Sequence, residues 1–172
     1  MPEKRTIRRA KQAKREGKAP TTQAGEFVRE EVEKIRHGEH GARSTKQAIA
    51  IGLSKARRAG VDLPPPEKGE APERTIKSAK RDLRKGQAEP SREPSAKRSK
   101  AITKALKREG KEAASSQALS RQAKQQARKR TPEERSASAK KAAKTRLAHQ
   151  TPAERRAIAR KAARTRAAQQ GK

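Results

Sequence analysis

The chain has 172 residues, and its 48 Lys and Arg against 19 Asp and Glu give it a formal net charge of +29. Only 18 side chains are large and apolar (Met, Ile, Leu, Val, Phe), whereas 32 are alanine. Such a composition excludes a single large hydrophobic core, because little apolar surface is available to offset the entropy of folding. We therefore expect an all-α protein, with a small N-terminal helical unit, extended basic helices and disordered linkers.

Several classes of protein are excluded by residue types that the chain lacks. Without cysteine there is no disulfide, thiolate zinc site or iron–sulfur cluster. The longest apolar run, residues 48–53, is far shorter than the roughly 20 residues that span a bilayer. No glycine-rich phosphate loop or nucleophile motif occurs, and no apolar segment of a secretory signal follows the basic start. We expect a non-enzymatic protein without cofactor, small-molecule substrate or membrane partner, cytoplasmic and nucleoid-associated.

Residues 1–63 hold 11 of the 18 large apolar side chains and are predicted to form the helical unit. Val28, Val32 and Ile35 recur at helical spacing, and the adjacent Phe27 is assigned to the core of the same helix. This helix is expected to begin near Thr21 and to end at Gly38.

A second helix is predicted after residue 44. Ser44 and Gln47 have the spacing of a capping box, in which both side chains satisfy free backbone N–H groups. Ile49, Leu53 and Ala56 continue the helical spacing, and Gly60 closes it. Residues 22–60 should thus form a helical hairpin, with residues 3–15 packed on it.

The next segments alternate between proline-containing stretches and basic helices. Three consecutive prolines open a linker over residues 64–95, which contains a short basic helix at 74–85 and a second proline-containing stretch at 87–95. Residues 96–130 are predicted to form a basic helical hairpin, with Ile102 and Leu106 facing Leu119, Ala123 and Ala127.

Internal repeats run through the whole chain. Residues 5–17 and 74–86 share Arg-Thr-Ile and a final Gly at identical spacing, and Lys-Arg-Glu-Gly-Lys occurs at both 14–18 and 107–111. Residues 131–150 and 151–170 form a tandem repeat in which 13 of 20 positions match. Each copy opens with Thr at the N-cap, Pro at N1 and Glu at N3, so each predicts a helix.

The two tandem copies are unusually basic. Residues 131–172 contain 12 Lys or Arg but only three Glu, all near predicted helix starts. At about 100° per residue the cations of the first copy surround most of the helix axis, so no apolar face is left for docking. We expect helices that fray when free and become firm on an anionic surface.

The charge pattern favours nucleic-acid phosphates as the ligand. Single-strand and RNA modules stack bases on exposed aromatic side chains, but the only aromatic residue is Phe27. We therefore expect sequence-independent binding to duplex DNA, as in histone-like nucleoid proteins, with RNA as a possible ligand. The expected phosphate contacts are Lys129, Arg130, Arg135, Lys140, Lys141, Lys144, Arg146, Arg155, Arg156, Arg160, Lys161, Arg164 and Arg166.

Two other functions stay open at this point: an RNA- or ribosome-associated basic protein, and a protein-interaction adaptor that uses residues 22–60. Residues 22–39 carry five acids and a local net charge of −2, which suits either a protein-binding surface or a helix held by i, i+4 ion pairs. The run His37-Gly38-Glu39-His40 contains metal-ligand types but lacks a second ligand cluster, so no metal site is predicted.

The stretch from Gly25 to Pro66, with its run Gly-Ala-Arg-Ser-Thr-Lys-Gln-Ala at 41–48, resembles a family of small uncharacterised bacterial proteins. Members usually carry only a generic DNA-binding description, which the resemblance extends to this chain as an expectation. The Lys/Ala/Arg-rich C-terminal repeats are similar in composition to the tails of linker histones and bacterial histone-like proteins. Neither resemblance implies particular site residues.

Overall fold

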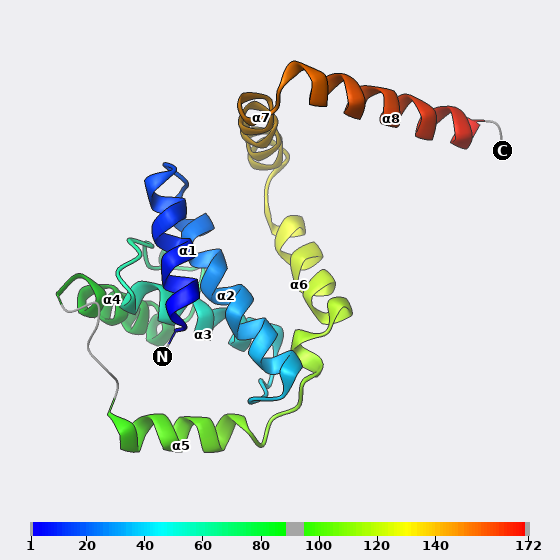
Figure 1. Cartoon of the computed structure of the whole chain (residues 1–172). Helices are drawn as coiled ribbons and strands as arrows, with labels where there is room; N and C mark the ends of the chain where they lie inside the picture. The colour runs from blue at the N-terminus through cyan, green and yellow to red at the C-terminus, as the bar shows by residue number, and fades with distance from the viewer. Residues whose placement is uncertain (1, 89–94, 171–172) are drawn as a thin grey trace. The chain divides into compact units, whose positions relative to one another are not determined.

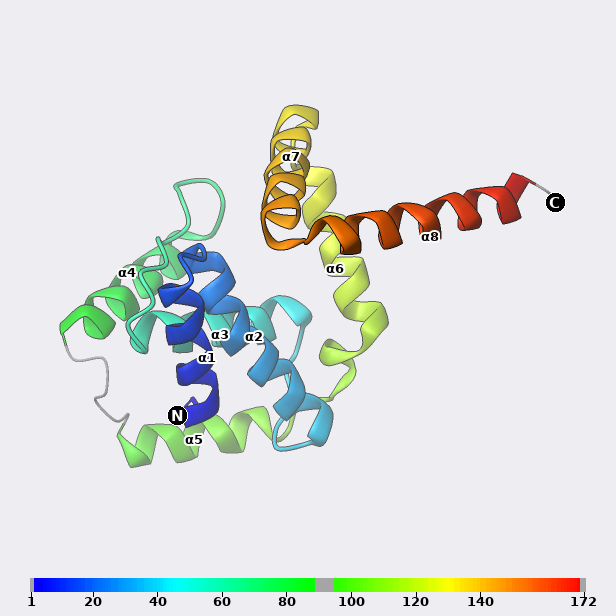
Figure 2. The same cartoon turned by 45° about the horizontal axis from the view of Figure 1, so that its top comes forward.

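The structure, a computed structural model, describes residues 2–88 and 95–170. In these residues every regular element is helical, which confirms the all-α fold (Figures 1 and 2). The chain divides into two units, residues 1–123 and 124–172. The elements are α1 (Lys4–Arg15), α2 (Pro20–His37), α3 (Thr45–Arg58), α4 (Glu73–Ala88), α5 (Ala96–Leu106), the short 3-10 helix η1 (Glu112–Ala114), α6 (Ser116–Lys129), α7 (Pro132–His149) and α8 (Pro152–Gln170).

The predicted helical hairpin forms the centre of the first unit as α2 and α3. Phe27 and Ile35 are almost fully buried on α2, which confirms that the only aromatic residue belongs to the core. Gly38 ends α2 in the left-handed conformation, with φ at 81°. At the start of α3 the Gln47 backbone N–H donates to Ser44 Oγ (3.2 Å), and Gln47 Oε1 accepts from the Arg43 backbone N–H (2.8 Å). Ser44 therefore caps α3 as expected, whereas Gln47 binds the N–H of the residue before the N-cap, so the capping box is only half formed.

The helix expected at residues 3–15 packs on this hairpin as α1. It buries Thr6, Ala10 and Ala13 against α2. Two arginines on the same helix reach carboxylates of α2: Arg9 lies 3.8 Å from Glu26 and Arg5 lies 4.0 Å from Glu33. Two of the five acids of residues 22–39 thus lie beside cations of α1.

The basic helix predicted inside a linker is α4, and the structure places it within the compact unit. It packs against α3 and buries Ala79, Asp82 and Gly86. Asp82 Oδ2 accepts from Ser54 Oγ (2.6 Å), and its Oδ1 accepts from Arg58 Nε (2.9 Å). This buried carboxylate fixes the face by which α4 docks on α3. The helical unit was expected to end at residue 63, so this contact was not predicted.

The proline tract before α4 is tied to α3. Arg57 is 7% exposed and donates from Nε to Leu63 O (3.1 Å) and from Nη2 to Pro64 O (3.0 Å). Burial lowers the pKa of Arg57, while the charge of Asp82 acts against that shift. Most of the second proline-containing stretch, 87–95, lies outside the described residues.

The hairpin expected at residues 96–130 is replaced by a different packing. α5 buries no residue, and Ile102 is 60% exposed instead of facing Leu119. Leu119 packs instead on a cluster in which Ala113 and Ala114 of η1 meet Ile35 of α2.

Hydrogen bonds to the η1 carbonyls and a close backbone contact at Gly41 explain why η1 docks on α2 and α3. Thr45 Oγ1 donates to Ala113 O (2.7 Å), and Arg36 Nε donates to Ala114 O (2.8 Å). Gly41 allows the approach, because a Cβ at this position would lie 1.9 Å from Glu109 O. Small side chains and hydrogen-bonded carbonyl groups thus hold η1 on α2 and α3. The spacing of the large apolar residues did not predict this contact.

Candidate nucleic-acid interface

The second unit consists of the end of α6 followed by α7 and α8, the two tandem repeats. At the start of α7 the Glu134 N–H donates to Thr131 Oγ1 (3.2 Å), and the Thr131 N–H donates to Glu134 Oε2 (2.9 Å). This reciprocal capping box begins the helix immediately before Pro132. The structure therefore confirms the helix start predicted for the first copy.

The second repeat begins in the same way. The Thr151 N–H donates to Glu154 Oε2 (2.8 Å), and the Glu154 N–H donates to Thr151 Oγ1 (3.3 Å). The pKa of Glu154 is lowered because its carboxylate accepts from the Thr151 backbone N–H and then from the Thr151 hydroxyl. These acids complete helix ends, where a negative charge also suits the helix dipole. They do not neutralise the cations further along.

The expected phosphate-binding residues are all exposed. Lys129 ends α6, Arg130 follows it, and the other eleven lie on α7 and α8. In the part of the chain that the structure describes, no carboxylate lies within 4.0 Å of any of them. Every side chain of α7 and α8 whose placement is described is also exposed. The two helices thus present unpaired cations and no docked face.

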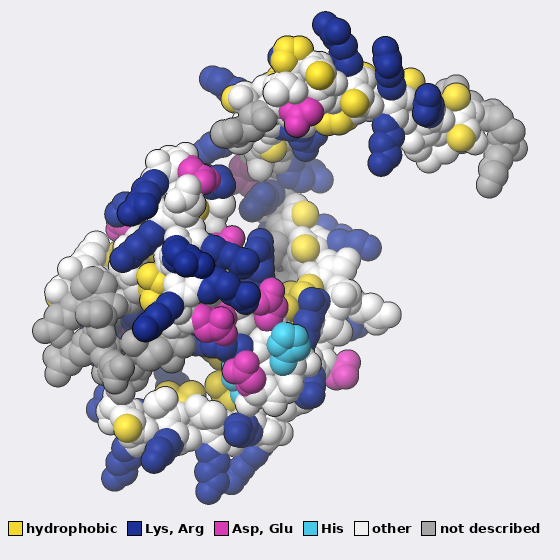
Figure 3. All heavy atoms as spheres, viewed as in Figure 1, with side chains coloured by type: hydrophobic (Ala, Val, Ile, Leu, Met, Phe, Trp, Pro, Cys, Tyr) yellow, Lys and Arg dark blue, Asp and Glu magenta, His cyan; other side chains and the backbone are white. Residues whose placement is uncertain are grey.

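The repeat places its cations at the same positions in both helices. Five of them match at a spacing of 20 residues. Taken at about 100° per residue, the five cover an arc of about 240° around each helix. Figure 3 shows Lys and Arg side chains projecting from more than one side of α8. The matched pairs are Arg135 with Arg155, Lys140 with Arg160, Lys141 with Lys161, Lys144 with Arg164, and Arg146 with Arg166.

The segment His37–His40 shows no built metal site. His40 Nε2 lies 3.3 Å from Glu31 Oε1, and its Nδ1 lies 3.1 Å from Gly41 O. Glu31 is fully buried, and its other carboxylate oxygen pairs with Lys55 Nζ. Across residues 2–88 and 95–170, no three His, Cys, Asp or Glu side chains gather in a way that could hold a metal ion.

The acidic segment 22–39 is largely paired within its own unit. Besides the α1 contacts, Glu30 Oε1 pairs with Lys34 Nζ (2.5 Å), and Glu30 Oε2 accepts from the Glu3 backbone N–H (3.1 Å). Burial raises the pKa of Glu30, but hydrogen bonds from Lys34, Thr6 and Glu3 together hold it below the ordinary value. Ion pairing within the fold therefore accounts for most of the acids that also suited a partner surface.

Sequence reasoning missed one set of exposed charges, on the compact unit. The outer side of α1 carries cations that line a shallow hollow and have no acidic partner within the described residues: Lys4, Arg8, Lys11 and Arg15. The sequence feature that could have indicated these cations is the repeat of residues 5–17 at 74–86, because it places similar charges on two helices.

None of the described helices has both the length and the hydropathy that a membrane span requires.

The comparisons with known proteins concern the compact unit alone. No curated protein and no solved structure matches the chain significantly. The matched region runs from the second half of α1 through α2 and α3 to the proline tract, and it excludes both tandem repeats. Over these residues, 11–68, the chain is similar to a family described as a family of unknown function (DUF6496).

Proposed function

We propose that the protein binds duplex DNA without sequence preference, in the manner of a nucleoid-associated, histone-like protein of the bacterial cytoplasm. The observation that carries this proposal is the set of exposed cations at the end of α6 and along α7 and α8, none of which has an acid within 4.0 Å among the described residues. Solubility alone requires far less net charge than the 12 Lys or Arg against three Glu of residues 131–172.

The dimensions of the helices suit a duplex. α7 has 18 residues, so its axis is about 27 Å long. Duplex DNA carries one phosphate charge per about 1.7 Å of axis, both strands counted, so a duplex segment of this length carries about 16 phosphates, of which the helix faces a part. Release of condensed counterions from these phosphates supplies the binding free energy. An α-helix also fits the major groove, which is about 12 Å wide.

Nothing in the second unit favours the reading of bases. Phe27 is 1% exposed, so the only aromatic ring is not offered for stacking. Cations spread around an isolated helix contact phosphates in many orientations, which gives affinity without sequence preference.

The test compares three forms of the full chain. In the first variant the ten matched cations of α7 and α8 become Gln, and in the control the same ten exchange Lys and Arg. Both changes keep good helix formers, so the helices should persist. Binding is measured by fluorescence anisotropy between 50 and 200 mM salt, on two unrelated duplexes of equal length.

We expect the wild type to lose affinity steeply with salt and to bind both duplexes within a few fold. The Gln variant should flatten the salt slope by up to about 9, because each phosphate contact contributes about 0.9. The charge-preserving control should stay within a few fold of the wild type. Unchanged binding by the Gln variant would overturn the proposal. Preference for duplex RNA in competition would indicate the RNA-associated function instead, and a protein partner retained after nuclease treatment would indicate the adaptor.

A further inference from the structure

The repeat between residues 5–17 and 74–86 is also a repeat in three dimensions. Residues 5–17 belong to α1, which packs on α2, and residues 74–86 belong to α4, which packs on α3. Two of the three buried positions of each helix correspond, Ala10 with Ala79 and Ala13 with Asp82. The third differs: Thr6 is buried while Thr75 is exposed, and Gly86 is buried while Gly17 is exposed. Each helix of the central hairpin is therefore covered by one copy of the same basic helix, docked by the same face.

The outward faces of the two copies also correspond. Arg8, Lys11 and Arg15 of α1 match Lys77, Lys80 and Arg84 of α4, and all six side chains are exposed. At about 100° per residue, each triplet falls within an arc of about 60° opposite the buried positions. Lys77 pairs with the exposed Glu73 (2.8 Å), a contact worth little in water. The other five have no carboxylate within 4.0 Å among the described residues.

Several acids of the compact unit lie at contacts between helices. Arg5 and Arg9 on α1 lie beside Glu33 and Glu26, and Arg58 on α3 pairs with Asp82 at 2.8 Å. Other acids pair with exposed cations close to them in sequence, as Glu16 does with Lys18 and Glu73 with Lys77. Apart from Lys77, the outward triplets are left without counter-charge on a folded, rigid scaffold, although exposed Glu side chains at these positions would have relieved the repulsion.

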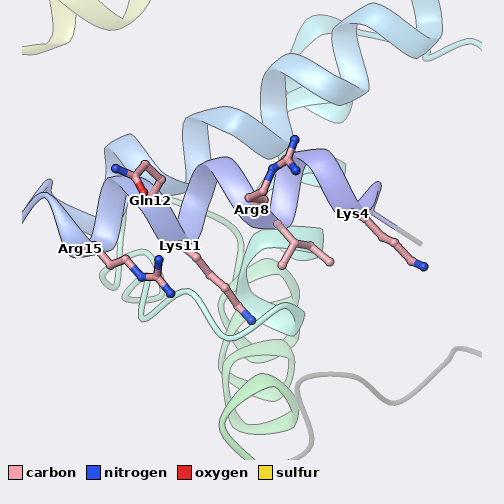
Figure 4. Close-up of a pocket in the computed structure, with 6 residues that line it drawn as sticks. Lys4, Arg8, Lys11, Gln12 and Arg15 are labelled. Atoms are coloured by element: carbon pink, nitrogen blue, oxygen red, sulfur yellow. The ribbon is translucent and has the colours of Figure 1, made fainter.

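We infer that the outward triplets of α1 and α4, each on its own helix of the compact unit, bind phosphates of duplex DNA and together make a second set of binding sites on this chain. This inference rests on the proposed function for the identity of the polyanion, but not for the existence of the sites. Figure 4 shows Lys4, Lys11 and Arg15 extending from one edge of α1, while Arg8 extends toward the other edge. All four line the same shallow hollow. On α1 the row extends about 17 Å along the helix, from Lys4 to Arg15, whereas on α4 it extends about 11 Å, because Glu73 occupies the position of Lys4. A row of either length suits an extended polyanion rather than a single enclosed phosphate.

Two sets of binding sites on one chain have a measurable consequence. When one set is bound, the other searches for phosphates at a raised effective concentration, so the full chain binds more tightly than either set alone. The compact unit then takes part in binding directly, instead of only carrying the basic repeats.

The experiment uses the full chain and two charge-matched variants. The first replaces the six outward residues of the triplets by Gln. The control removes the same charge from the α5 region by replacing six exposed cations that also lack an acidic partner among the described residues: Lys97, Arg98, Lys100, Lys104, Lys107 and Arg108. Unfolding midpoints are measured first, so that loss of fold is distinguished from loss of binding.

Both variants are made in the wild type and in the chain whose α7 and α8 cations are Gln. We expect the triplet variant to lower the salt slope by about 5 in the wild type and to weaken further the residual binding of the α7 and α8 variant, which keeps Lys129, Arg130 and Arg156. The α5 control should lower the slope less than the triplet variant does, because α5 buries no residue and its cations are not held in place by packing as those of α1 and α4 are. Equal effects of the two variants, or no effect of the triplet variant, would overturn the second set of sites.

The two proposals fail differently in this experiment. If the α7 and α8 substitutions leave binding unchanged while the triplet substitutions abolish it, the proposed function of the second unit is wrong and the set of sites on the compact unit stands. If competing duplex RNA displaces the DNA at lower concentration than duplex DNA does, the assignment of DNA as the ligand of the triplets is overturned.

Discussion

The buried carboxylate of Asp82 offers a sharp test of how α4 is held on the compact unit. Asp82 is 2% exposed and accepts from Ser54 Oγ (2.6 Å) and Arg58 Nε (2.9 Å). The substitution Asp82→Ala removes the acceptor of both donors. It leaves the α4 backbone able to form its own helical hydrogen bonds, so the expected loss is one of docking rather than of helix formation.

The loss of unfolding free energy expected for Asp82→Ala depends on how exposed the two donors are. A hydrogen bond to a charged group contributes about 1.5–3 kcal/mol, and one between neutral groups about 1 kcal/mol. The Arg58 side chain is 43% exposed, so it regains water when its partner is lost, and its share must be discounted. We expect Asp82→Ala to lower the free energy of unfolding by about 2 kcal/mol, or about 1 M in urea midpoint. Arg58→Ala should cost more, because it leaves a buried carboxylate with only Ser54.

Amide hydrogen exchange at increasing urea, followed on peptides from α3 and α4, measures this loss without interference from α7 and α8. Asp62→Ala is the control, since Asp62 is exposed and makes only a 3.5 Å contact with Gln87 Nε2. The control should change stability by less than about 0.5 kcal/mol. If Asp82→Ala proves no more destabilising than Asp62→Ala, the docking role assigned to the carboxylate is refuted.

Three further outcomes are expected. Gly86→Ala should lower the urea midpoint of the compact unit, because its Cβ would lie 1.8 Å from Arg57 O, whereas Gly25→Ala, with open space around it, should raise stability by about 0.5–1 kcal/mol. The pKa of Glu30 lies below 4.5 in the folded state, so its contribution to stability is present above pH 4.5 and is lost as the pH falls through the folded pKa; unfolding midpoints between pH 3 and 6 should fall less steeply for Glu30→Gln than for the wild type. A peptide of residues 131–172 should gain helix by circular dichroism when duplex DNA is added, and an unchanged spectrum at saturation would contradict coupled folding on phosphates.

Local signals were sufficient to predict several elements of the structure. The capping residues Thr131 and Thr151 begin α7 and α8 where expected, and Gly38 ends α2. Phe27 was assigned to the core from the neighbouring apolar spacing, and it is buried. Caps and glycine C-termini depend on groups within about five residues of one another, so they can be predicted without knowledge of the tertiary contacts.

Some of the exposed cations could be predicted from the sequence and others could not. The exposure of the cations on α7 and α8 could be predicted, because helices without an apolar face have no surface to bury. The outward triplets of α1 and α4 could not, since a cation-rich helix alone does not show which of its charges will meet acids. Arg5 and Arg8 are alike in sequence, yet Arg5 lies 4.0 Å from Glu33 and Arg8 has no such partner among the described residues.

What the sequence by itself determined is therefore the helical class, the helix ends and the excess of positive charge. Tertiary structure alone decided that α4 belongs to the compact unit and that Ala113 and Ala114 complete its core. Alanine and glycine carry too little apolar surface to show from spacing where they pack. Their burial depends on whether another backbone approaches closely enough to fill the space, and that is settled only when segments distant in sequence meet.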